Sequence, residues 1–345
     1  MLSETELAGD TCTAIAIGEA PWCCPACHGS LVAGADSLSC QGCVKTFPVF
    51  ADIPDLRLAG PAWIDFAQDR ARAVITEAHI REFGLESAIV QVFRHSRHFS
   101  DEKSAYRARQ VIAGVDKCSA QIQTWMTPLL VSPALEIGCG AGQLLAACAR
   151  RGIAIAGVDI SLEWLVIAKH LARANGRPVH LAAAMAEKLP VRSGSTCSVL
   201  SLDVIEHVGS QKAYCDEIAR ILTREGNFGI STPNRFSFSP EPHVGVWGVG
   251  YLPIRLQQGW VKLVSDQDYR FTRLLSCKEA LSLFAPHPEI SVEVVFPAIS
   301  DEDIALFPEL KAFLARQYNR LCTSTMLRFA LPFFGAYYRL IGRKM

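Results

Sequence analysis

One short stretch, Leu135 to Gln143, limits the folds open to this chain more than any other. Three glycines alternate within it, at Gly138, Gly140 and Gly142, between two apolar runs. This order fits a buried strand, a tight turn and the start of a helix. Because the turn lacks Cβ atoms, a ligand can approach its backbone closely. Such a turn alone does not identify the ligand, since dinucleotide-binding folds and many packed turns share it.

The chain beyond this turn alternates apolar runs that resemble strands with stretches of helical period. The runs that we expect to be strands are 153–159, 178–181, 196–202, 228–232 and 290–296, and the intervening helices are 161–175, 212–222 and 278–284. Strands that alternate with helices imply right-handed crossovers and a mostly parallel sheet. We therefore expect an α/β fold.

An acidic residue, Asp159, ends the second of these strands, 21 positions after Gly138. A carboxylate at this place can accept hydrogen bonds from both hydroxyls of a ribose that lies beside the glycine turn. Sites for NAD and for S-adenosylmethionine share this spacing. The turn itself reads E-x-G-x-G-x-G, with Gln143 where the last glycine of a dinucleotide motif would stand.

The segment Glu136–Gly142 resembles the first motif of class I S-adenosylmethionine-dependent methyltransferases. Ala184–Pro190 resembles the segment of that family that packs on the adenine, and Leu202–Val208 resembles the segment after the fourth strand. The resemblance covers about residues 130–235. It implies a Rossmann-like, seven-stranded, mostly parallel sheet with helices on both faces. The cofactor-binding residues that it implies are Glu136, Gly138, Gly140, Gly142, Asp159, Ile160, Met185, Ala186 and Asp203, with Met185 in place of the usual acid.

Four cysteines near the start have the spacing of a metal site. Cys24 and Cys27 form one C-x2-C pair and Cys40 and Cys43 form another, with Cys23 as a spare thiol. Two such turns can present four thiolates to one structural Zn²⁺. The segment also resembles the small zinc ribbons that precede bacterial methyltransferase domains and the zinc-ribbon activators of tRNA methyltransferases. We expect a small β zinc ribbon over residues 21–58.

The spacing of Asp203, Glu206 and His207 allows two interpretations, a divalent-metal site or a purely structural role. D-x-x-E-H resembles the E-x-x-E-H of ubiquinone-pathway O-methyltransferases, where a divalent metal is associated with these groups, and Mg²⁺ is the candidate ion here. Alternatively, Glu206 and His207 cap the next helix and shape the floor of the pocket. His207 is also a candidate general base, because the ordinary pKa of histidine lies near neutrality.

A loop rich in Pro, Gly and aromatic residues follows the fifth strand. It resembles a TPNR…PEPH…WGVG insertion found in a subset of bacterial methyltransferases, and its position is that of a substrate lid over residues 233–273. Glu241 and His243 are the polar groups of this loop. They are candidate catalytic residues, and the alternative is that they hydrogen-bond within the loop.

The ends of the chain carry further expectations. Residues 1–20 lack the features of a signal peptide and are expected to form a leader. Most of the thirteen cysteines are scattered singly, which indicates a reducing, cytoplasmic protein and not a disulfide scaffold. Residues 59–128 are expected to form a helical cap on the methyltransferase core, 129–300. Residues 301–345 have seven basic residues after position 310 and no acid after that position, and are expected to be a basic helical extension that contacts a membrane surface, the core or a second copy in a homodimer.

Together these features predict methyl transfer from S-adenosylmethionine to a small-molecule acceptor, with O-methylation of a metabolite, sugar or phenol preferred. Lys plus Arg equals Asp plus Glu at 34 each, which argues against DNA and disfavours RNA as partner. Two alternatives stay open at this point. One is an RNA base methyltransferase that grips RNA with the zinc ribbon, and the other is a non-catalytic, methyltransferase-like adaptor.

Overall fold

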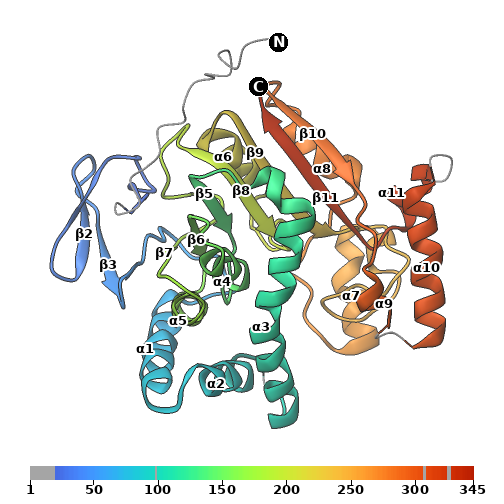
Figure 1. Ribbon diagram of the computed structural model, residues 1–345, viewed down its shortest axis with the longest axis horizontal. Coiled ribbons are helices and arrows are strands. Elements are labelled where there is room, and N and C mark those ends of the chain that lie inside the picture. The colour runs from blue at the N-terminus through green and yellow to red at the C-terminus, as the bar shows by residue number, and fades with distance from the viewer. Residues whose placement is uncertain (1–19, 98, 306–307, 325–327) are drawn as a thin grey trace, which may run out of the picture.

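The computed structural model describes residues 20–97, 99–305, 308–324 and 328–345. The expected leader over residues 1–20 lies outside these described residues apart from its last position. A central seven-stranded sheet dominates the fold (Figure 1). Its strands in spatial order are β10 (Ile290–Val295), β11 (Tyr337–Lys344), β9 (Leu222–Pro233), β8 (Thr196–Leu202), β5 (Ala134–Ile137), β6 (Ile155–Asp159) and β7 (His180–Ala183).

Strand β5 lies near the middle of the sheet and pairs in parallel with β6 on one side and β8 on the other. Strands β7 and β9 continue the parallel arrangement outward, whereas β11 runs antiparallel to both β9 and β10. The strand order thus reverses beside β5. Ligands of such sheets bind in the crevice at this reversal, outside the carboxyl ends of the strands. The expectation of a seven-stranded, mostly parallel sheet is confirmed.

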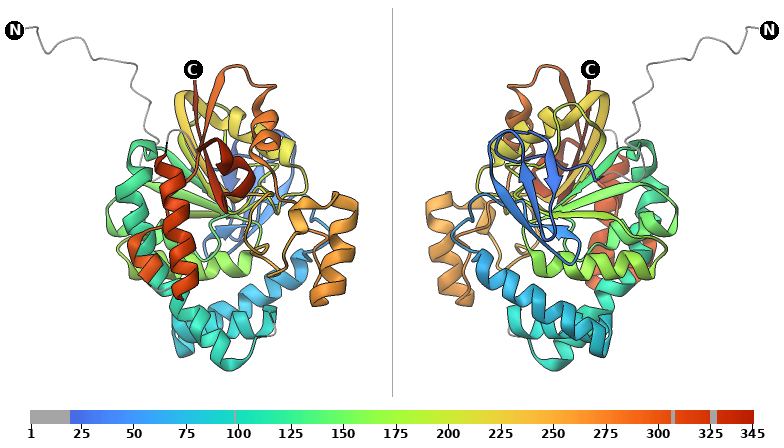
Figure 2. Two further views of the ribbon diagram at one scale, coloured as in Figure 1. Left: turned by 90° about the vertical axis from the view of Figure 1, so that its right-hand side faces the viewer. Right: turned by 90° about the vertical axis from the view of Figure 1, so that its left-hand side faces the viewer.

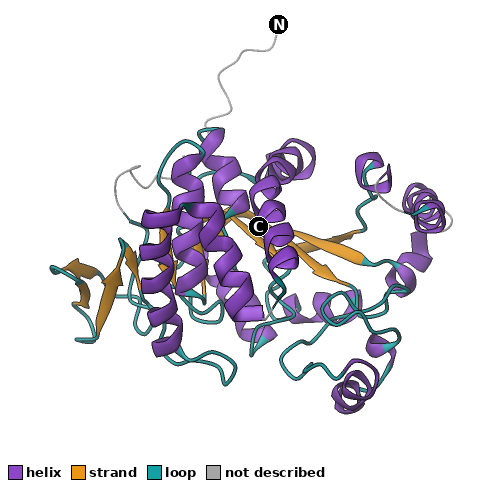
Figure 3. Cartoon of the chain, turned by 90° about the horizontal axis from the view of Figure 1, so that it is seen from below, coloured by secondary structure: helices purple, strands orange, loops and turns teal. Residues whose placement is uncertain are grey.

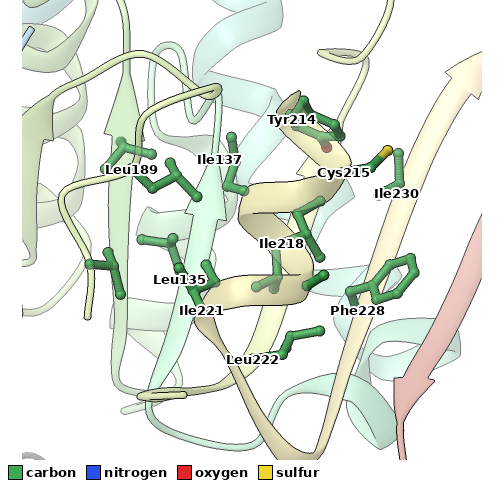
Figure 4. Packing of buried hydrophobic residues seen from close by; sticks show 14 of the residues in the cluster. Leu135, Ile137, Leu189, Tyr214, Cys215, Ile218, Ile221, Leu222, Phe228 and Ile230 are labelled. Carbon is green, nitrogen blue, oxygen red and sulfur yellow. The ribbon is translucent and has the colours of Figure 1, made fainter. Parts of the chain in front are cut away.

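Helices cover both faces of the sheet (Figures 2 and 3). The helices that alternate with the strands are α4 (Gln143–Arg150), α5 (Leu162–Ala174), α6 (Gln211–Ile221) and α8 (Cys277–Phe284). On one face, Leu135 and Ile137 of β5 pack against Tyr214 and Ile218 of α6 (Figure 4). The opposite face is covered by α4 and α5, whose alanine- and leucine-rich surfaces form a second core.

Three further helices precede the sheet: α1 (Phe66–Phe83), α2 (Leu85–Arg97) and α3 (Asp101–Gln121). A π-helical turn (Ile122–Met126) and a 3-10 turn (Thr127–Leu129) lead from α3 to β5. Asp65 and Ser100 cap the starts of α1 and α3 by accepting backbone amides. Buried residues of all three helices belong to the core that α4 and α5 form, so this segment packs over one face of the sheet.

The cysteine-rich segment forms a small antiparallel sheet beside the β7 edge of the main sheet (Figure 1). Its strands are β1 (Leu31–Ala33), β2 (Ser37–Cys40), β3 (Thr46–Phe50) and β4 (Ile53–Pro54). We call residues 21–58 the ribbon. Trp22, Phe47 and Leu56 of the ribbon are buried in the same core as β5 and α6, so the ribbon and the main sheet share one hydrophobic interior.

The long loop between β9 and α8 holds a 3-10 turn (Val249–Tyr251) and helix α7 (Ile254–Ser265). It has a small core of its own, formed by Val246, Val249, Val261 and Tyr269. Arg235 ties the loop together, since its guanidinium donates to the Gly250 carbonyl at 2.9 Å and to Glu279 of α8 at 2.7 Å. We call residues 233–273 the lid.

The expectation of a helical extension over residues 301–345 is wrong for its last part. Helices α9 (Asp301–Ala305), α10 (Glu309–Thr323) and α11 (Leu331–Phe334) and a 3-10 turn (Arg328–Ala330) lie there, but Tyr337–Lys344 forms β11. Burial alternates along β11, with Tyr338 and Leu340 fully buried, which is the period of a strand.

The basic residues of β11 serve the fold and do not form a basic helical surface. Arg343 pairs with Glu225, Lys344 donates to the Ala219 carbonyl at 2.7 Å, and Arg339 lies over the ring of Trp125. These three cations therefore do not belong to a basic C-terminal helix of the kind that we expected to contact a membrane. Among the described residues, none of the helices combines the length and apolar character needed to cross a bilayer.

Candidate functional site

The glycine turn joins β5 to α4, and all three of its glycines have positive φ, at 71° for Gly138, 49° for Gly140 and 76° for Gly142. A Cβ on Gly138 would lie 2.3 Å from Cγ2 of Val204, and one on Gly142 would lie 2.6 Å from Cβ of Ala168. Close packing therefore requires both glycines. A Cβ on Gly140 would meet no atom within 4 Å, so the backbone there is open to a ligand.

Asp159 ties this turn to the start of α5. Its two carboxylate oxygens accept the amide of Gly140 at 2.8 Å and the amide of Ser161 at 2.9 Å. Ser161 in turn caps α5. An ionised carboxylate offers about four acceptor positions, so Asp159 can accept ribose hydroxyls in addition to these amides. Ile160 lies between them, and its carbonyl accepts Nη1 of Arg57 at 2.7 Å.

Glu136 is 4% exposed, and its Oε2 is buried without a hydrogen-bond partner among the described residues. Burial, reinforced by the charge of Asp159, raises the pKa of Glu136 well above its ordinary value. A buried carboxyl oxygen without a partner carries a large desolvation cost, which a cationic donor would remove. The ammonium group of S-adenosylmethionine is a donor of this kind. The open glycine backbone and this oxygen both fit that cofactor.

Met185 and Ala186 lie half-buried in the loop that follows β7. The amide of Ala184 donates to the Asp159 carbonyl at 2.9 Å, so this loop begins beside the carboxylate that is expected to bind the ribose. Glu187 accepts the amide of Gly209 at 2.7 Å, and thereby fixes the loop to the start of α6. The glutamate of this motif thus has a structural role, while Met185 offers an apolar side chain at the expected adenine position.

The residues that follow β8 meet the lid. Glu206, His207 and His243 each have an oxygen or nitrogen atom able to bind a metal, and these three atoms lie within 4.8 Å of one another. Val204 packs on Gly138, which places the loop that holds Glu206 against the glycine turn. Glu206 is 1% exposed. Its Oε2 accepts the Thr232 hydroxyl at 3.0 Å, and its Oε1 is buried without a hydrogen-bond partner among the described residues. Burial and the charge of Asp203 raise the pKa of Glu206 to about 7.

His243 is oriented by Glu241, another buried carboxylate of the lid. The His243 Nδ1 and Glu241 Oε1 lie 2.5 Å apart, and Oε2 of Glu241 accepts the amides of His243 and Val244 at 2.8 and 2.9 Å. Because a carboxylate only accepts, the proton of a neutral His243 lies on Nδ1 and its Nε2 is basic. That Nε2 lies 3.9 Å from Oε1 of Glu206. Burial opposes protonation of His243, but Glu241 and Glu206 outweigh it and raise the pKa of His243.

His207 stands beside this pair, with its ring perpendicular to that of His243 and the ring centroids 4.7 Å apart. The three candidate catalytic residues, His207, Glu241 and His243, are thus brought together from the core and the lid. Glu206 joins them.

Asp203 stands outside this group of donor atoms. It has a positive φ of 57°, and its carboxylate accepts the Ser231 hydroxyl at 3.1 Å. The three ligands that we expected for Mg²⁺, Asp203, Glu206 and His207, therefore do not form the cluster, since His243 takes the place of Asp203. One carboxylate and two imidazoles are typical of zinc, iron or manganese sites, whereas Mg²⁺ prefers oxygen ligands. The residues present do not fit Mg²⁺.

The four cysteines of the ribbon come together as their spacing predicts. Their sulfurs lie within 4.8 Å of one another, with 3.5 Å between Cys24 and Cys43 and 3.4 Å between Cys27 and Cys40. A tetrahedral zinc–thiolate site has neighbouring sulfurs roughly 3.8 Å apart. This arrangement fits one structural zinc ion. Cys23 is fully buried outside the group, and burial raises the pKa of its thiol to about 11.

Three residues at or beside the site were not expected from the sequence. Tyr337, the first residue of β11, lies close enough to Asp203, Glu206 and Glu241 for their charges to raise its pKa together with burial, the largest cause. Arg57 and Asp69, from the ribbon tail and α1, form a buried ion pair at 2.6 Å behind Ile160. No pattern marks any of the three, because their roles depend on contacts between distant segments.

Comparison with known proteins agrees with this geometry. Residues 135–230 match the family model described as a methyltransferase domain. The chain is 31% identical over 153 residues to a ubiquinone biosynthesis O-methyltransferase of Idiomarina loihiensis, covering 43% of this chain and 60% of the relative. It is 35% identical over 101 residues to the protein of the same name from Rhizobium rhizogenes, covering 29% and 41%. The chain thus spans about half the length of these curated relatives.

Two of the solved structures that match this chain are methyltransferases. Geranyl diphosphate C-methyltransferase from Streptomyces coelicolor is 18% identical with a TM-score of 0.42, covering 66% of this chain and 78% of that one. An S-adenosylmethionine-dependent methyltransferase from Mesorhizobium loti is 17% identical with a TM-score of 0.47, covering 67% and 100%. The matched family, the strand order and the glycine turn together identify residues 135–230 as a class I S-adenosylmethionine-dependent methyltransferase domain.

Proposed function

We propose that the protein transfers the methyl group of S-adenosylmethionine to a hydroxyl of a small-molecule acceptor, with His243 as the general base. The observation that carries this proposal is the Glu241–His243 pair. The Nε2 of His243 lies 3.9 Å from Oε1 of Glu206, an oxygen that has no hydrogen-bond partner among the described residues. The names of the relatives, ubiquinone biosynthesis O-methyltransferases, support oxygen as the methylated atom.

Bound S-adenosylmethionine supplies an electrophilic methyl group on a sulfonium, and the chain's own residues hold and deprotonate the acceptor. A hydroxyl between His243 Nε2 and Glu206 Oε1 could donate to Nε2 and accept a hydrogen bond from the protonated form of Glu206, because a gap of this size accommodates one bridging oxygen. His243 then takes the proton as the oxygen–methyl bond forms, and the resulting imidazolium is stabilised by Glu241. Such a base contributes about 10²- to 10⁴-fold to the rate.

The lid is the part of the site that would select the acceptor. Phe238, Trp247 and Tyr251 give the lid exposed aromatic surface, which suits an acceptor that carries a ring or an apolar group. We favour a phenol, a sugar or another hydroxylated metabolite as substrate class.

The proposal is tested with the purified full chain in two steps. Calorimetry with S-adenosylhomocysteine measures cofactor binding, and transfer of isotopically labelled methyl to a panel of phenols, sugars and hydroxylated lipids measures activity. We expect binding, and methylation of at least one hydroxylated class that falls when His243 is replaced by glutamine. Unchanged transfer in His243→Gln would refute the assignment of the base. Transfer to RNA but to no small molecule would establish the RNA alternative, and no cofactor binding would leave the adaptor.

A further inference from the structure

The ribbon contacts the methyltransferase domain at both ends of the loop expected to hold the adenine. At one end, the amide of Leu56 donates to the Ala183 carbonyl at 2.8 Å, directly before Ala184. At the other end, the amide of Cys23 donates to the Pro190 carbonyl at 2.8 Å. Cys23 precedes the zinc-site residue Cys24. Because a peptide bond joins Cys23 to Cys24, the position of the cysteine cluster determines where Cys23 holds this end of the adenine loop.

A second set of contacts joins the ribbon tail to the loop expected to hold the ribose. The Arg57 side chain is completely buried, and its guanidinium binds both oxygens of Asp55 at 2.6 and 2.7 Å. Its Nη1 also donates to Asp69 at 2.6 Å and to the Ile160 carbonyl at 2.7 Å. Charge-assisted hydrogen bonds of this kind are among the strongest in proteins. Ile160 directly follows Asp159, so Arg57 fixes the backbone beside the ribose-binding carboxylate.

Asp69 of α1 completes these contacts from the other side. One of its oxygens accepts the Ser161 hydroxyl at 2.8 Å, and the other accepts the Leu162 amide at 2.8 Å. Asp69 therefore satisfies amide and hydroxyl donors at the start of α5, although it belongs to a helix more than 90 positions earlier. Both cofactor loops of the domain are thus held by residues outside residues 135–230.

We propose that the ribbon and Asp69 act as a brace for the cofactor site, so that metal in the ribbon sets the affinity for S-adenosylmethionine. The ribbon has only four strands of two to five residues, and part of it packs in the core of the main sheet. The two cysteine turns hold little apolar surface of their own, so a structural metal supplies the stability that fixes them. When the ribbon loosens, Leu56, Cys23 and Arg57 no longer fix the two loops. The apparent dissociation constant then rises in inverse proportion to the fraction of molecules whose loops are formed.

The proposal rests on the proposed function for the identity of the ligand, and its test separates the two. The full chain is loaded with one zinc ion, and its affinity for S-adenosylhomocysteine is measured by calorimetry before and after the zinc is removed with a chelator. We expect removal to weaken binding about tenfold or more. By reciprocity, S-adenosylhomocysteine should slow zinc loss to the chelator, because coupling between two binding sites acts equally in both directions.

The variant Asp69→Asn tests the brace without disturbing the metal. It keeps the size of the side chain but replaces one of the two acceptor oxygens, so zinc content should stay at one per chain while the dissociation constant rises about tenfold. Hydrogen exchange of the zinc-loaded variant should show lost protection at residues 160–162. Arg81→Gln is the matched control, since Arg81 pairs with Glu77 on the same helix, is exposed and should leave affinity unchanged.

Each outcome decides a different question. If the zinc-loaded chain binds no S-adenosylhomocysteine, both the proposed function and the brace are refuted. If it binds equally well with and without zinc, or if Asp69→Asn binds as tightly as Arg81→Gln, the brace is refuted and the proposed function stands.

Discussion

Replacing Glu206 with glutamine should stabilise the protein above neutral pH. The folded-state pKa of Glu206 is raised from 4.5 to about 7 by burial and by the charge of Asp203. A carboxyl with a raised folded pKa contributes stability below its unfolded pKa, and this contribution is lost as pH rises through the folded pKa. Each pKa unit corresponds to about 1.4 kcal/mol, so the ionised side chain costs about 3 kcal/mol above pH 7.

The difference in unfolding free energy between Glu206→Gln and the wild-type chain should therefore grow with pH. Between about pH 5.5 and about pH 8 this difference should grow by about 2 kcal/mol, because pH 5.5 lies roughly 1.5 pH units below the folded pKa of Glu206. Urea unfolding at both pH values measures it, and taking the difference between two chains cancels the titration of the ribbon thiols. Glu82→Gln, an exposed carboxylate of α1, is the control and should show no such growth. A difference that stays flat, or falls with pH, would contradict the assigned burial cost.

Further perturbations address the base, the cofactor and the metals. Activity should rise with pH through an apparent pKa above 6.5, the ordinary value for histidine, because the raised pKa of His243 keeps it protonated at lower pH; a pH–rate profile checks this. Asp159→Ala should abolish measurable binding of S-adenosylhomocysteine in calorimetry, since it removes the ribose acceptor and the tie to Gly140. The double variant of Cys27 and Cys40 to serine should lose zinc by elemental analysis and unfold at lower urea concentration. Omitting Mg²⁺ from the assay should leave the rate unchanged, because two imidazoles and one carboxylate suit other metals, and a strict Mg²⁺ requirement would overturn that reasoning.

The central sheet was predictable because its signals are local. The apolar runs at 153–159 and 196–202, each followed by a turn and a helix start, specify strand and helix without knowledge of the neighbours. Strand β11 was missed for the opposite reason. Its aromatic and basic residues fit a surface helix equally well, and only the space between β9 and β10 makes Tyr338 and Leu340 inward-facing residues.

The residues of the candidate site also fall into two groups, those that local spacing reveals and those that depend on contacts between distant segments. The glycine turn, Asp159 and the four cysteines are defined by spacing along the chain, so the sequence could single them out. The meeting of His243 with Glu206 depends on how the lid folds back over β8, which no spacing reveals. The role of Asp69 is the hardest to predict from the sequence, because an acid in the first turn of a helix normally indicates only a favourable interaction with the helix dipole.

The place of β11 in the sheet also constrains the order in which the chain can fold. Strand β10 is made on the ribosome before β11, yet it reaches the rest of the sheet only by pairing with β11. Until residues 337–344 emerge, β9 presents an open edge and β10 lacks the strand with which it pairs, so this part of the nascent chain exposes unpaired backbone. Asn234 at the root of the lid donates to the Gly335 carbonyl at 2.9 Å, just before β11. The acceptor side of the site therefore becomes complete only after the cofactor side has had time to form.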